Sequence, residues 1–308
     1  MTTFPLFHLP LVAMEHVLCM MCPIDLINLS WLSFRVDRTV ASFSRTKPKF
    51  RVVLSFTQKP RLLIDVGTEY AGYGWTPKEL ETDSETYSKY PTKYLMDAYD
   101  YIKEVLKCQF QIVVFDLSSY PSQNELITDW LRSQNQSIAT MEISNSGKET
   151  DDDLKYLMSK ITVTDKLILA TRKYKDDFQM EIPTNSYETL IENSGFIDFE
   201  QLLRLKNSCI TLHQSRLTDQ ELNKFLKSWM ACESHLMLET FEINVSGPEA
   251  MEVIMDLPHE ETADPNVVES FGKKFDNPVV ENWFDIKRCD GKVATVGLGF
   301  RYTTKLRF

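Results

Sequence analysis

Large apolar side chains dominate the chain between Phe4 and Val36, and two prolines divide this stretch. Proline is accepted at the first position of a helix, and it disfavours helical backbone in the residue before it. Pro10 and Pro23 therefore each predict the start of a short helix. The pattern gives one helix over residues 11–21, a second beginning at Pro23, and a third from near Ser30 to about Val40.

These short helices carry more apolar surface than they can bury against one another. Within residues 11–21 only Glu15, His16 and Cys19 are not plainly apolar, which makes the apolar surface wider than the stripe of an ordinary surface helix. An apolar patch too large for a monomer marks an interface. The apolar pieces fall short of the roughly 20 residues that cross a membrane, and no basic start precedes them, so neither a membrane span nor a secretory signal is predicted.

Short strands are predicted beyond these helices. Residues 50–56 and 61–66 have the pattern of a β-hairpin, the polar stretch 69–94 is typical of a long loop, and residues 95–108 return to helical periodicity.

A weak repeat then runs through the chain, with the order apolar, two spacers, apolar, acid, apolar, and Ser or Asn. Clear copies begin at Ile112, Ile138 and Leu238, and looser ones at Thr164, Tyr187 and Ser208. Each copy is followed by a loop and an amphipathic helix. The apolar anchor positions, 20 to 31 residues apart, are Phe115, Met141, Leu167, Leu190, Ile210 and Phe241.

Strands that alternate with helices at such intervals resemble leucine-rich repeats, in which each unit buries its apolar face by stacking on its neighbours. Thr218 and Glu221 give a capping-box signature, which places a helix after one of the strands. The predicted fold class is α/β, with N-terminal helices followed by a leucine-rich-repeat-like β/α solenoid. A compact α/β domain with the same order of elements is the alternative. The turn at Asp290-Gly291 predicts a C-terminal β-hairpin that caps the solenoid.

Composition and charge narrow the functional classes. The chain has 308 residues, of which 43% are hydrophobic, so it can bury a sizeable core. Its formal net charge of −10 does not favour binding to the phosphate backbone of nucleic acids, and suits a basic partner better. The six cysteines are scattered, so we expect free thiols in a reducing compartment and no disulfide.

The chain shows no motif for catalysis or metal binding. Cys19-x-x-Cys22 has metal-ligand spacing, but no second pair of ligands follows at a suitable distance, so neither zinc nor another cofactor is expected. The stretch at Ser146 lacks the first glycine of a phosphate loop, and neither Gly-x-Ser-x-Gly nor His-Glu-x-x-His is present. For His213 a surface or binding role is favoured over catalysis. The sequence therefore predicts a non-catalytic protein.

The stretch "LPLVAMEHVLCMMCPIDLINLSWLSFRV" resembles an F-box, the segment that docks onto the Skp-family adaptor of cullin-based ubiquitin ligases. Phe34 and Val36 depart from the family pattern, which usually has lysine and tryptophan there. The matching positions are Leu9-Pro10 for the opening Leu-Pro, residues 23–27 for the central Pro-x-Asp-Leu-Leu, and Leu32-Ser33 with Arg35 for the Val-Ser-Lys-Arg signature. The residues that this resemblance places at the adaptor are Leu9, Pro10, Val17, Leu18, Met21, Pro23, Ile24, Asp25, Leu26, Leu29, Ser33 and Arg35.

The remainder of the chain resembles the F-box-associated domain of the large nematode F-box families, most clearly at residues 217–230 and 284–296 and more weakly at residues 127–134. The two resemblances imply an F-box over residues 1–42 and a substrate-binding, repeat-like domain over residues 43–308. They further imply the substrate-recognition subunit of an SCF-type ubiquitin ligase, whose partners are the Skp-family adaptor, the cullin core and a target protein. The alternative is a protein that sequesters one partner without its degradation.

The repeat also predicts where a target binds. In the clear copies the acid lies between two inward-facing apolar residues, so strand alternation turns it toward solvent. A row of acids attracts a basic partner. Neither nucleic acid nor a membrane is expected as a partner, and the expected location is the cytoplasm, with the nucleus as a second site. The expected target contacts are Asp116, Glu142, Thr211, His213, Glu242 and Asn244.

Overall fold

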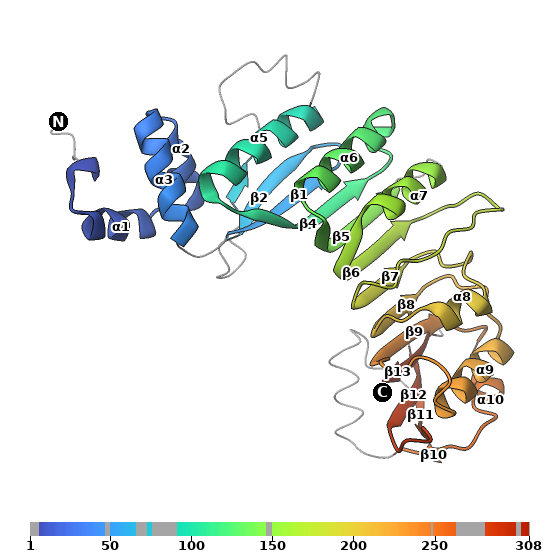
Figure 1. The fold of residues 1–308 in the computed structure, drawn as a ribbon. Coiled ribbons are helices and arrows are strands. Elements are labelled where there is room, and N and C mark those ends of the chain that lie inside the picture. The colour runs from blue at the N-terminus through green and yellow to red at the C-terminus, as the bar shows by residue number, and fades with distance from the viewer. Residues whose placement is uncertain are drawn as a thin grey trace. The chain divides into compact units, whose positions relative to one another are not determined.

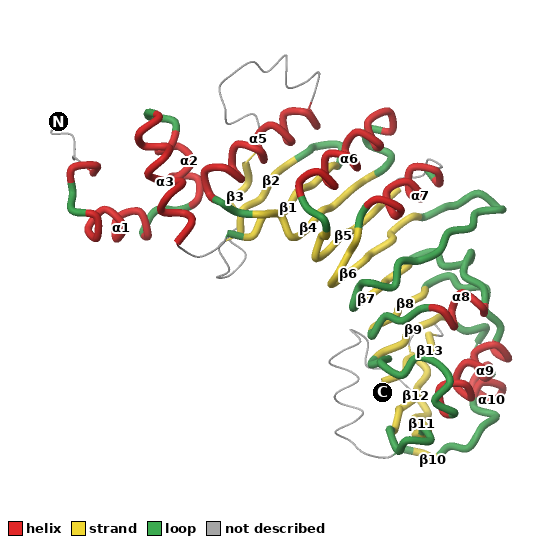
Figure 2. Tube along the Cα trace, viewed as in Figure 1, coloured by secondary structure: helices red, strands yellow, loops and turns green. Residues whose placement is uncertain are grey.

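The structure is a computed structural model that describes residues 6–46, 50–65, 73–75, 91–145, 150–247, 249–262, 281–299 and 303–307. The chain forms two compact units, residues 1–138 and residues 139–308. Both are mixed α/β: in each, strands form a sheet and helices lie along it, as Figure 1 and Figure 2 show. Many strand pairs are parallel, which agrees with the predicted α/β class.

Short helices open the first unit at the positions that the prolines predict. They are η1 (Leu6–His8), α1 (Leu11–Cys19), α2 (Pro23–Ser30) and α3 (Phe34–Thr46). The third helix begins and ends later than predicted. Ser33 Oγ accepts a hydrogen bond from Val36 N at 3.4 Å, a capping contact that starts α3 after Ser33. The boundary predicted between residues 42 and 43 falls inside α3.

The first unit continues with a small sheet. The predicted hairpin is confirmed, because β1 (Arg51–Phe56) pairs antiparallel with β2 (Arg61–Asp65). The neighbours β3 (Tyr73–Trp75) and β4 (Gln109–Asp116) extend the sheet on either side, antiparallel to β2 and parallel to β1 respectively. Much of the loop predicted over residues 69–94 lies outside the described residues. The helical elements here are α5 (Pro91–Leu106), η3 (Pro121–Gln123) and α6 (Asn124–Gln134).

Helix α5 covers part of the apolar surface of the N-terminal helices. Ser30 Oγ, at the end of α2, is hydrogen-bonded to Tyr101 Oη at 2.6 Å, and the Trp31 and Tyr101 rings lie 6.0 Å apart. Leu26 of α2 and Val40 of α3 are fully buried. The predicted need of these helices for further packing is therefore met in part within the same unit.

The second unit contains the sheet order β10-β11-β12-β13-β9-β8-β7-β6-β5. Strands β6 to β9 are parallel neighbours in chain order, so successive strands stack side by side. The elements of this unit up to α10 are β5 (Ser137–Asn145), α7 (Asp151–Lys160), β6 (Thr162–Thr171), β7 (Glu188–Ile191), α8 (Phe199–Arg204), β8 (Cys209–Leu212), α9 (Asp219–Met230), β9 (Thr240–Asn244) and α10 (Ala250–Ile254).

The connection between β6 and β7 departs from the predicted pattern. Residues 172–187 contain no helix, so the expectation that each repeat strand is followed by one is wrong here. Pro183 interrupts the segment. Its aromatic residues Tyr174 and Phe178 instead stack on each other, with ring centroids 4.3 Å apart.

The repeat anchors are buried with one exception. Leu167, Ile210 and Phe241 are at most 1% exposed. In β7, however, the residue in register with Leu167 and Ile210 is Thr189, and Leu190 points to the other face. The predicted anchor at Leu190 is therefore wrong by one residue. The fully buried Thr189 can take the inward place because its hydroxyl is hydrogen-bonded to Ser186 Oγ at 2.9 Å.

A buried amide ties two repeat strands together at their beginnings. Asn207, which precedes β8, donates from Nδ2 to the Ser186 carbonyl at 2.6 Å and to Ser186 Oγ at 3.0 Å. Ser186 precedes β7. In the first unit Asn135 similarly donates to the Phe110 carbonyl of β4 at 3.3 Å. The repeat pattern read from the sequence did not include these amides.

We expect Asn207→Ala to lower the free energy of unfolding by about 2 kcal/mol, because it removes the amide that donates to the buried Ser186 carbonyl and to Ser186 Oγ. Chemical denaturation of the two proteins measures this difference. The control Asn193→Ala removes one hydrogen bond, to the Arg172 carbonyl, at a less buried position and should lose less than about 1 kcal/mol. Equal losses in the two variants would contradict the role assigned to Asn207.

Antiparallel strands complete the second unit: β10 (Glu260–Glu261), β11 (Glu281–Lys287), β12 (Val293–Gly299) and β13 (Thr303–Arg307). The predicted hairpin is confirmed, since β11 and β12 pair on either side of Asp290-Gly291. Gly291 has a φ of 95°, a conformation that favours glycine. Strand β13 pairs with β9 and so joins the hairpin to the parallel strands.

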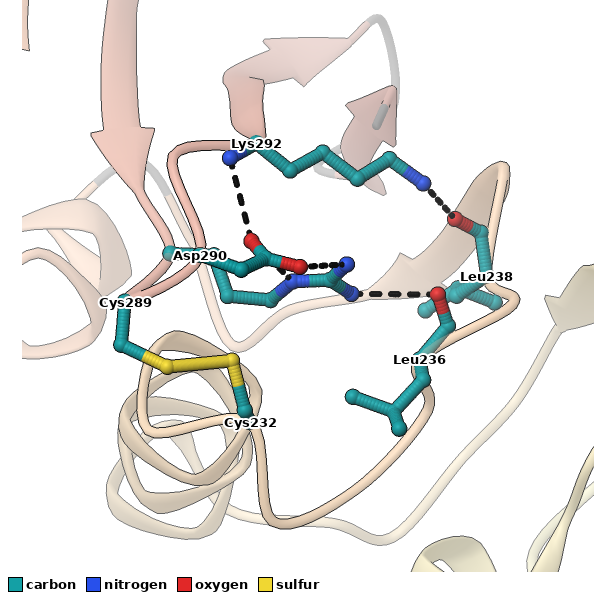
Figure 3. A network of polar contacts seen from close by, with 7 residues as sticks. Cys232, Leu236, Leu238, Cys289, Asp290 and Lys292 are labelled. Carbon is teal, nitrogen blue, oxygen red and sulfur yellow. Dashed lines mark hydrogen bonds and ion pairs between the residues drawn. A yellow bond between two sulfur atoms is a disulfide. The ribbon is translucent and has the colours of Figure 1, made fainter.

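The hairpin turn is attached to the segment after α9 by a disulfide and a polar network (Figure 3). The bond joins Cys232 to Cys289, so the expectation of no disulfide is wrong. The two cysteines are 57 residues apart in sequence, and only the hairpin brings them together. Arg288 donates to the Leu236 carbonyl at 3.1 Å and to both carboxylate oxygens of Asp290, which lowers the pKa of Asp290 to about 2.

His235 lies in the same segment and has an unusual environment. Its ring packs edge-on against Phe225, with centroids 4.8 Å apart, and both ring nitrogens are shielded from solvent. This burial lowers the pKa of His235 to about 4. The histidine is therefore neutral in the folded protein near neutral pH.

We expect the unfolding free energy to fall by about 3 kcal/mol as the pH drops from about 6.5 to 4, because the unfolded chain binds the His235 proton first. The variant His235→Phe keeps the ring contact and should lack this loss. Denaturation curves at pH 7, 5.5 and 4 test it. The same loss of unfolding free energy between pH 7 and pH 4 in His235→Phe as in the wild type would refute the assignment.

Candidate functional site

Helix α1 has an apolar surface that its own unit leaves largely uncovered. Among its nine residues only Leu18 is buried. Leu11 is 65% exposed and Val12 is 67% exposed. A helix that is apolar on all sides is expected to be buried. The prediction of excess apolar surface at residues 11–21 is confirmed for α1.

A groove of about 560 Å³ runs between α1 and α3. Leu18 lies among its lining residues together with Leu11 and Met14 from α1, and Phe34 and Phe43 line it from α3. Arg35, Arg38, Glu15, Thr39 and Ser42 add a polar margin. The Arg38 guanidinium lies over the Phe34 ring, 5.7 Å from its centroid. The groove therefore offers apolar contacts beside two cationic side chains.

The residues predicted to contact the adaptor lie in three kinds of environment. Leu18, Pro23 and Leu26 are buried; Leu9, Val17, Met21, Ile24 and Leu29 are half-buried; Pro10, Asp25, Ser33 and Arg35 are exposed. A charged substitution at the first three would disturb the packing of the unit, so it could not report on docking alone. Large apolar side chains that are exposed here, and that the prediction did not include, are Leu11, Val12, Met20, Trp31, Leu32 and Phe34.

Asp25 has a local structural role. Its carboxylate accepts a hydrogen bond from Cys22 N at 3.3 Å, and Cys22 Sγ accepts one from Asp25 N at 3.4 Å. This reciprocal pair is a capping box that starts α2 after Cys22. This capping contact explains the presence of Asp25 without requiring a contact to a partner protein.

The face of the second sheet opposite its buried side carries several of the predicted target residues. The strand register places Glu242 of β9, Thr211 of β8 and Leu190 of β7 in one row. All three are half-buried, as is Glu142 on β5. The outward direction predicted for Glu142, Thr211 and Glu242 is therefore confirmed. Their role in binding stays a prediction.

Asp116 does not lie on such a face. It ends β4 in the first unit and is only 6% exposed. Its carboxylate accepts hydrogen bonds from Ser118 N at 3.0 Å and from Ser119 Oγ at 2.7 Å. The expected exposure of Asp116 is wrong, because the chain turns directly after the strand and uses this carboxylate to stabilise the turn.

His213 and Asn244 also have partners within the chain. His213 Nδ1 lies 3.1 Å from Glu192 Oε2. Asn244 accepts a hydrogen bond from Ser215 N at 2.6 Å and donates to the Ser215 carbonyl at 3.3 Å. Asn244 therefore holds the segment after β8 in place, a role that requires no target.

The described part of the chain has neither a metal-binding cluster nor a membrane-spanning helix. Its residues include no group of three or more His, Cys, Asp or Glu side chains placed to hold a metal ion. No helix within the described ranges combines the length and the apolar character needed to cross a bilayer.

Similarity to known proteins points to one family. Residues 177–243, which include β7, β8 and most of β9, match the family model described as F-box associated. A similar protein is the Skn-1 dependent zygotic transcript 15 protein of Caenorhabditis elegans, which is 24% identical over 225 residues. The alignment covers 70% of this chain and 62% of that protein, so the chain spans about three fifths of the relative's length. No solved structure matches. The chain thus contains a segment that matches the F-box-associated family, and it is similar to a protein of a nematode.

Proposed function

We propose that this protein is the substrate-recognition subunit of an SCF-type ubiquitin ligase and has no catalytic activity of its own. The observation that carries the proposal is the uncovered apolar surface of α1, in a stretch that resembles an F-box. The F-box-associated match supports the same assignment, because that domain accompanies F-boxes. In this proposal α1, α2 and α3 dock onto a Skp-family adaptor, through an interface of about 1,500 Å².

The second unit is the proposed target-binding part. Its parallel strands, stacked in chain order, suit a leucine-rich-repeat-like scaffold that the antiparallel strands β10 to β13 close at one end. Glu142, Thr211 and Glu242 offer an outward surface with two acids, which favours a basic target segment. His213 and Asn244 border this surface, each already engaged with a neighbouring residue.

The proposed mechanism is tethering. A target held by the second unit, on a chain bound to the ligase, meets the ubiquitin carrier at a high effective concentration instead of by a bimolecular encounter. The proposed location is the cytoplasm or the nucleus. The Cys232–Cys289 bond is unusual for a reducing compartment. The mass of the alkylated protein purified from cells shows whether Cys232 and Cys289 are free thiols or a disulfide, and so tests the proposed location.

The function is tested by recovering the tagged chain from nematode cells with the proteasome active or blocked. We expect a co-purified protein that accumulates, with attached ubiquitin, when the proteasome is blocked. A variant with Leu11→Glu and Phe34→Glu should retain that protein without the adaptor or the ubiquitin. If the co-purified protein has the same abundance and the same attached ubiquitin with the wild type and with the double variant, sequestration is favoured and the degradative role is overturned.

A further inference from the structure

The loops that follow strands β6, β7 and β8 enclose a pocket of about 430 Å³. The strands are parallel neighbours, so their carboxyl ends meet at one edge of the sheet. Ligands of open parallel sheets commonly bind outside the carboxyl ends of the strands. None of the target residues predicted from the sequence lines this pocket. Most of its lining lies within residues 177–243, the segment that matches the F-box-associated family.

Three aromatic rings make one side of the pocket rigid. Tyr174 and Phe178 stack with centroids 4.3 Å apart, and Phe196 meets them edge-on at 5.1 Å and 4.9 Å respectively. Phe178 is 4% exposed and Phe196 is 9% exposed. The aromatic cluster replaces the missing helix after β6, and it fixes the loop from residue 172 onward against the loop after β7.

Hydrogen bonds link the same loops to one another. Asn193 Nδ2, after β7, donates to the Arg172 carbonyl after β6 at 3.0 Å. Ser194 donates to the His213 carbonyl after β8, from N at 2.8 Å and from Oγ at 2.9 Å. The pocket is therefore built from segments that hold each other in place, so a ligand would meet a pre-formed site.

The charges at the pocket favour an anion. Two acidic residues of the lining cap helices. Asp198 Oδ1 accepts a hydrogen bond from Gln201 N at 2.7 Å, and Glu221 Oε2 accepts one from Thr218 N at 2.7 Å. Lys173 and Arg216 line the pocket, and within the described residues neither forms an ion pair.

Of the remaining charged lining residues, Asp176 is exposed at the pocket and Lys175 Nζ lies 3.9 Å from Asp152. Within the described ranges, the pocket lining thus carries two cations without an ion pair, Lys173 and Arg216, and one carboxylate with neither an ion pair nor a hydrogen bond, Asp176.

The Arg216 side chain lies close to the backbone of Gly195. A Cβ atom on Gly195 would lie 3.2 Å from Arg216 Nε and 3.5 Å from its Cδ and Cγ. The arginine stem therefore lies against the backbone of Gly195, and a large side chain at this position would displace it. Arg216 is exposed and lines the pocket, and the planar fork of its guanidinium matches a carboxylate.

We propose that this pocket binds an acidic side chain of the target protein, with Arg216 and Lys173 as its cationic contacts and the aromatic cluster beside it. The inference rests on the proposed function, because it assumes that the second unit holds the target. The proposed target surface then has two parts, the acidic strand face and this cationic pocket. A preferred target segment then carries an acidic residue at the pocket in addition to basic residues elsewhere.

The probe is a fluorescein-labelled peptide in which glutamate and phenylalanine are separated by glycine, and fluorescence polarisation with the full chain measures its binding. We expect saturable binding that the glutamine version of the peptide lacks. Arg216→Ala should weaken binding about tenfold, the loss expected for a charge-assisted hydrogen bond. Lys173→Ala should weaken it less. The control Lys224→Ala, which removes an exposed lysine of α9 outside the pocket lining, should bind normally.

Gly195→Leu distinguishes binding in the pocket from general attraction by surface charge, because it displaces the Arg216 side chain but leaves the charge of the protein unchanged. We expect it to weaken binding as Arg216→Ala does. Equal affinity for the two peptides, full binding by Arg216→Ala, or no binding up to about 1 mM peptide would overturn the proposal. Adaptor co-purification is measured on the same variants. If the adaptor co-purifies but the peptide does not bind the pocket, the proposed function stands and only the pocket proposal fails. If the peptide binds the pocket but the adaptor does not co-purify, only the ligase role is overturned.

Discussion

A chain carrying Leu11→Glu and Phe34→Glu is expected to lose co-purification with a Skp-family adaptor. Both side chains line the groove between α1 and α3, and they are 65% and 76% exposed. Burial of a large apolar side chain at an interface contributes about 1.5 to 3 kcal/mol, and a buried unpaired carboxylate is strongly unfavourable. Two such changes should weaken binding by several orders of magnitude.

The double variant should remain folded, which makes the result interpretable. Leu11 and Phe34 are the first residues of α1 and α3, where the helix dipole favours a glutamate. Exposed positions of this kind change stability by only about 0.5 kcal/mol. The matched control is Leu126→Glu on α6 of the same unit, where a leucine is 56% exposed outside this groove. Leu126→Glu should co-purify with the adaptor as the wild type does. Undiminished co-purification of the double variant would show that the groove does not bind the adaptor.

Reduction of the Cys232–Cys289 bond is expected to lower the free energy of unfolding by about 4 kcal/mol. The bond closes a chain segment with a sequence separation of 57 residues, and the loss of chain entropy in the unfolded state accounts for a stabilisation of that size. The hydrogen bonds from Arg288 and Lys292 to the Leu236 and Leu238 carbonyls do not involve the cysteines, so we expect them to remain after reduction. We therefore expect a less stable hairpin attachment with the same geometry.

Denaturation of the wild type with and without dithiothreitol measures this effect. The variant with Cys232→Ser and Cys289→Ser should resemble the reduced wild type and should not respond to the reductant. Cys19→Ser, which changes an exposed free cysteine, is the control and should behave as the wild type does. Identical curves for oxidised and reduced wild-type protein would show that the bond adds nothing to stability.

The order of elements could be predicted from the sequence because local patterns determine it. Pro10 and Pro23 start helices at the expected places, and the capping box of Thr218 and Glu221 forms as the residue types indicate. The turn at Asp290-Gly291 likewise requires only a glycine with positive φ. Each of these features depends on neighbouring residues in the chain.

Features that depend on distant residues could not be predicted. The inward residue of β7 is Thr189 because Ser186 supplies a hydrogen bond, whereas apolar periodicity favours Leu190. Burial of Leu26 depends on packing within the folded unit, so an apolar position in an F-box-like motif does not indicate an exposed contact. The Cys232–Cys289 pair is separated by too much sequence for spacing to reveal it.

The candidate sites show the same division. Excess apolar surface on α1 follows from its composition alone, and the structure adds which side chains are exposed. The pocket after β6, β7 and β8 has no sequence motif, since Lys173, Gly195 and Arg216 come from three separate loops. Only the parallel alignment of the strands brings these residues together.

Calorimetric titration of the purified full chain with a purified nematode Skp-family adaptor tests the central claim most directly. The account predicts a saturable one-to-one complex with a Kd below about 1 µM, which corresponds to about −8 kcal/mol. Binding should disappear with Leu11→Glu and Phe34→Glu and persist with Leu126→Glu. No heat of binding from the folded wild-type chain, or equal binding by the double variant, would contradict the docking of α1, α2 and α3 and with it the proposed ligase role.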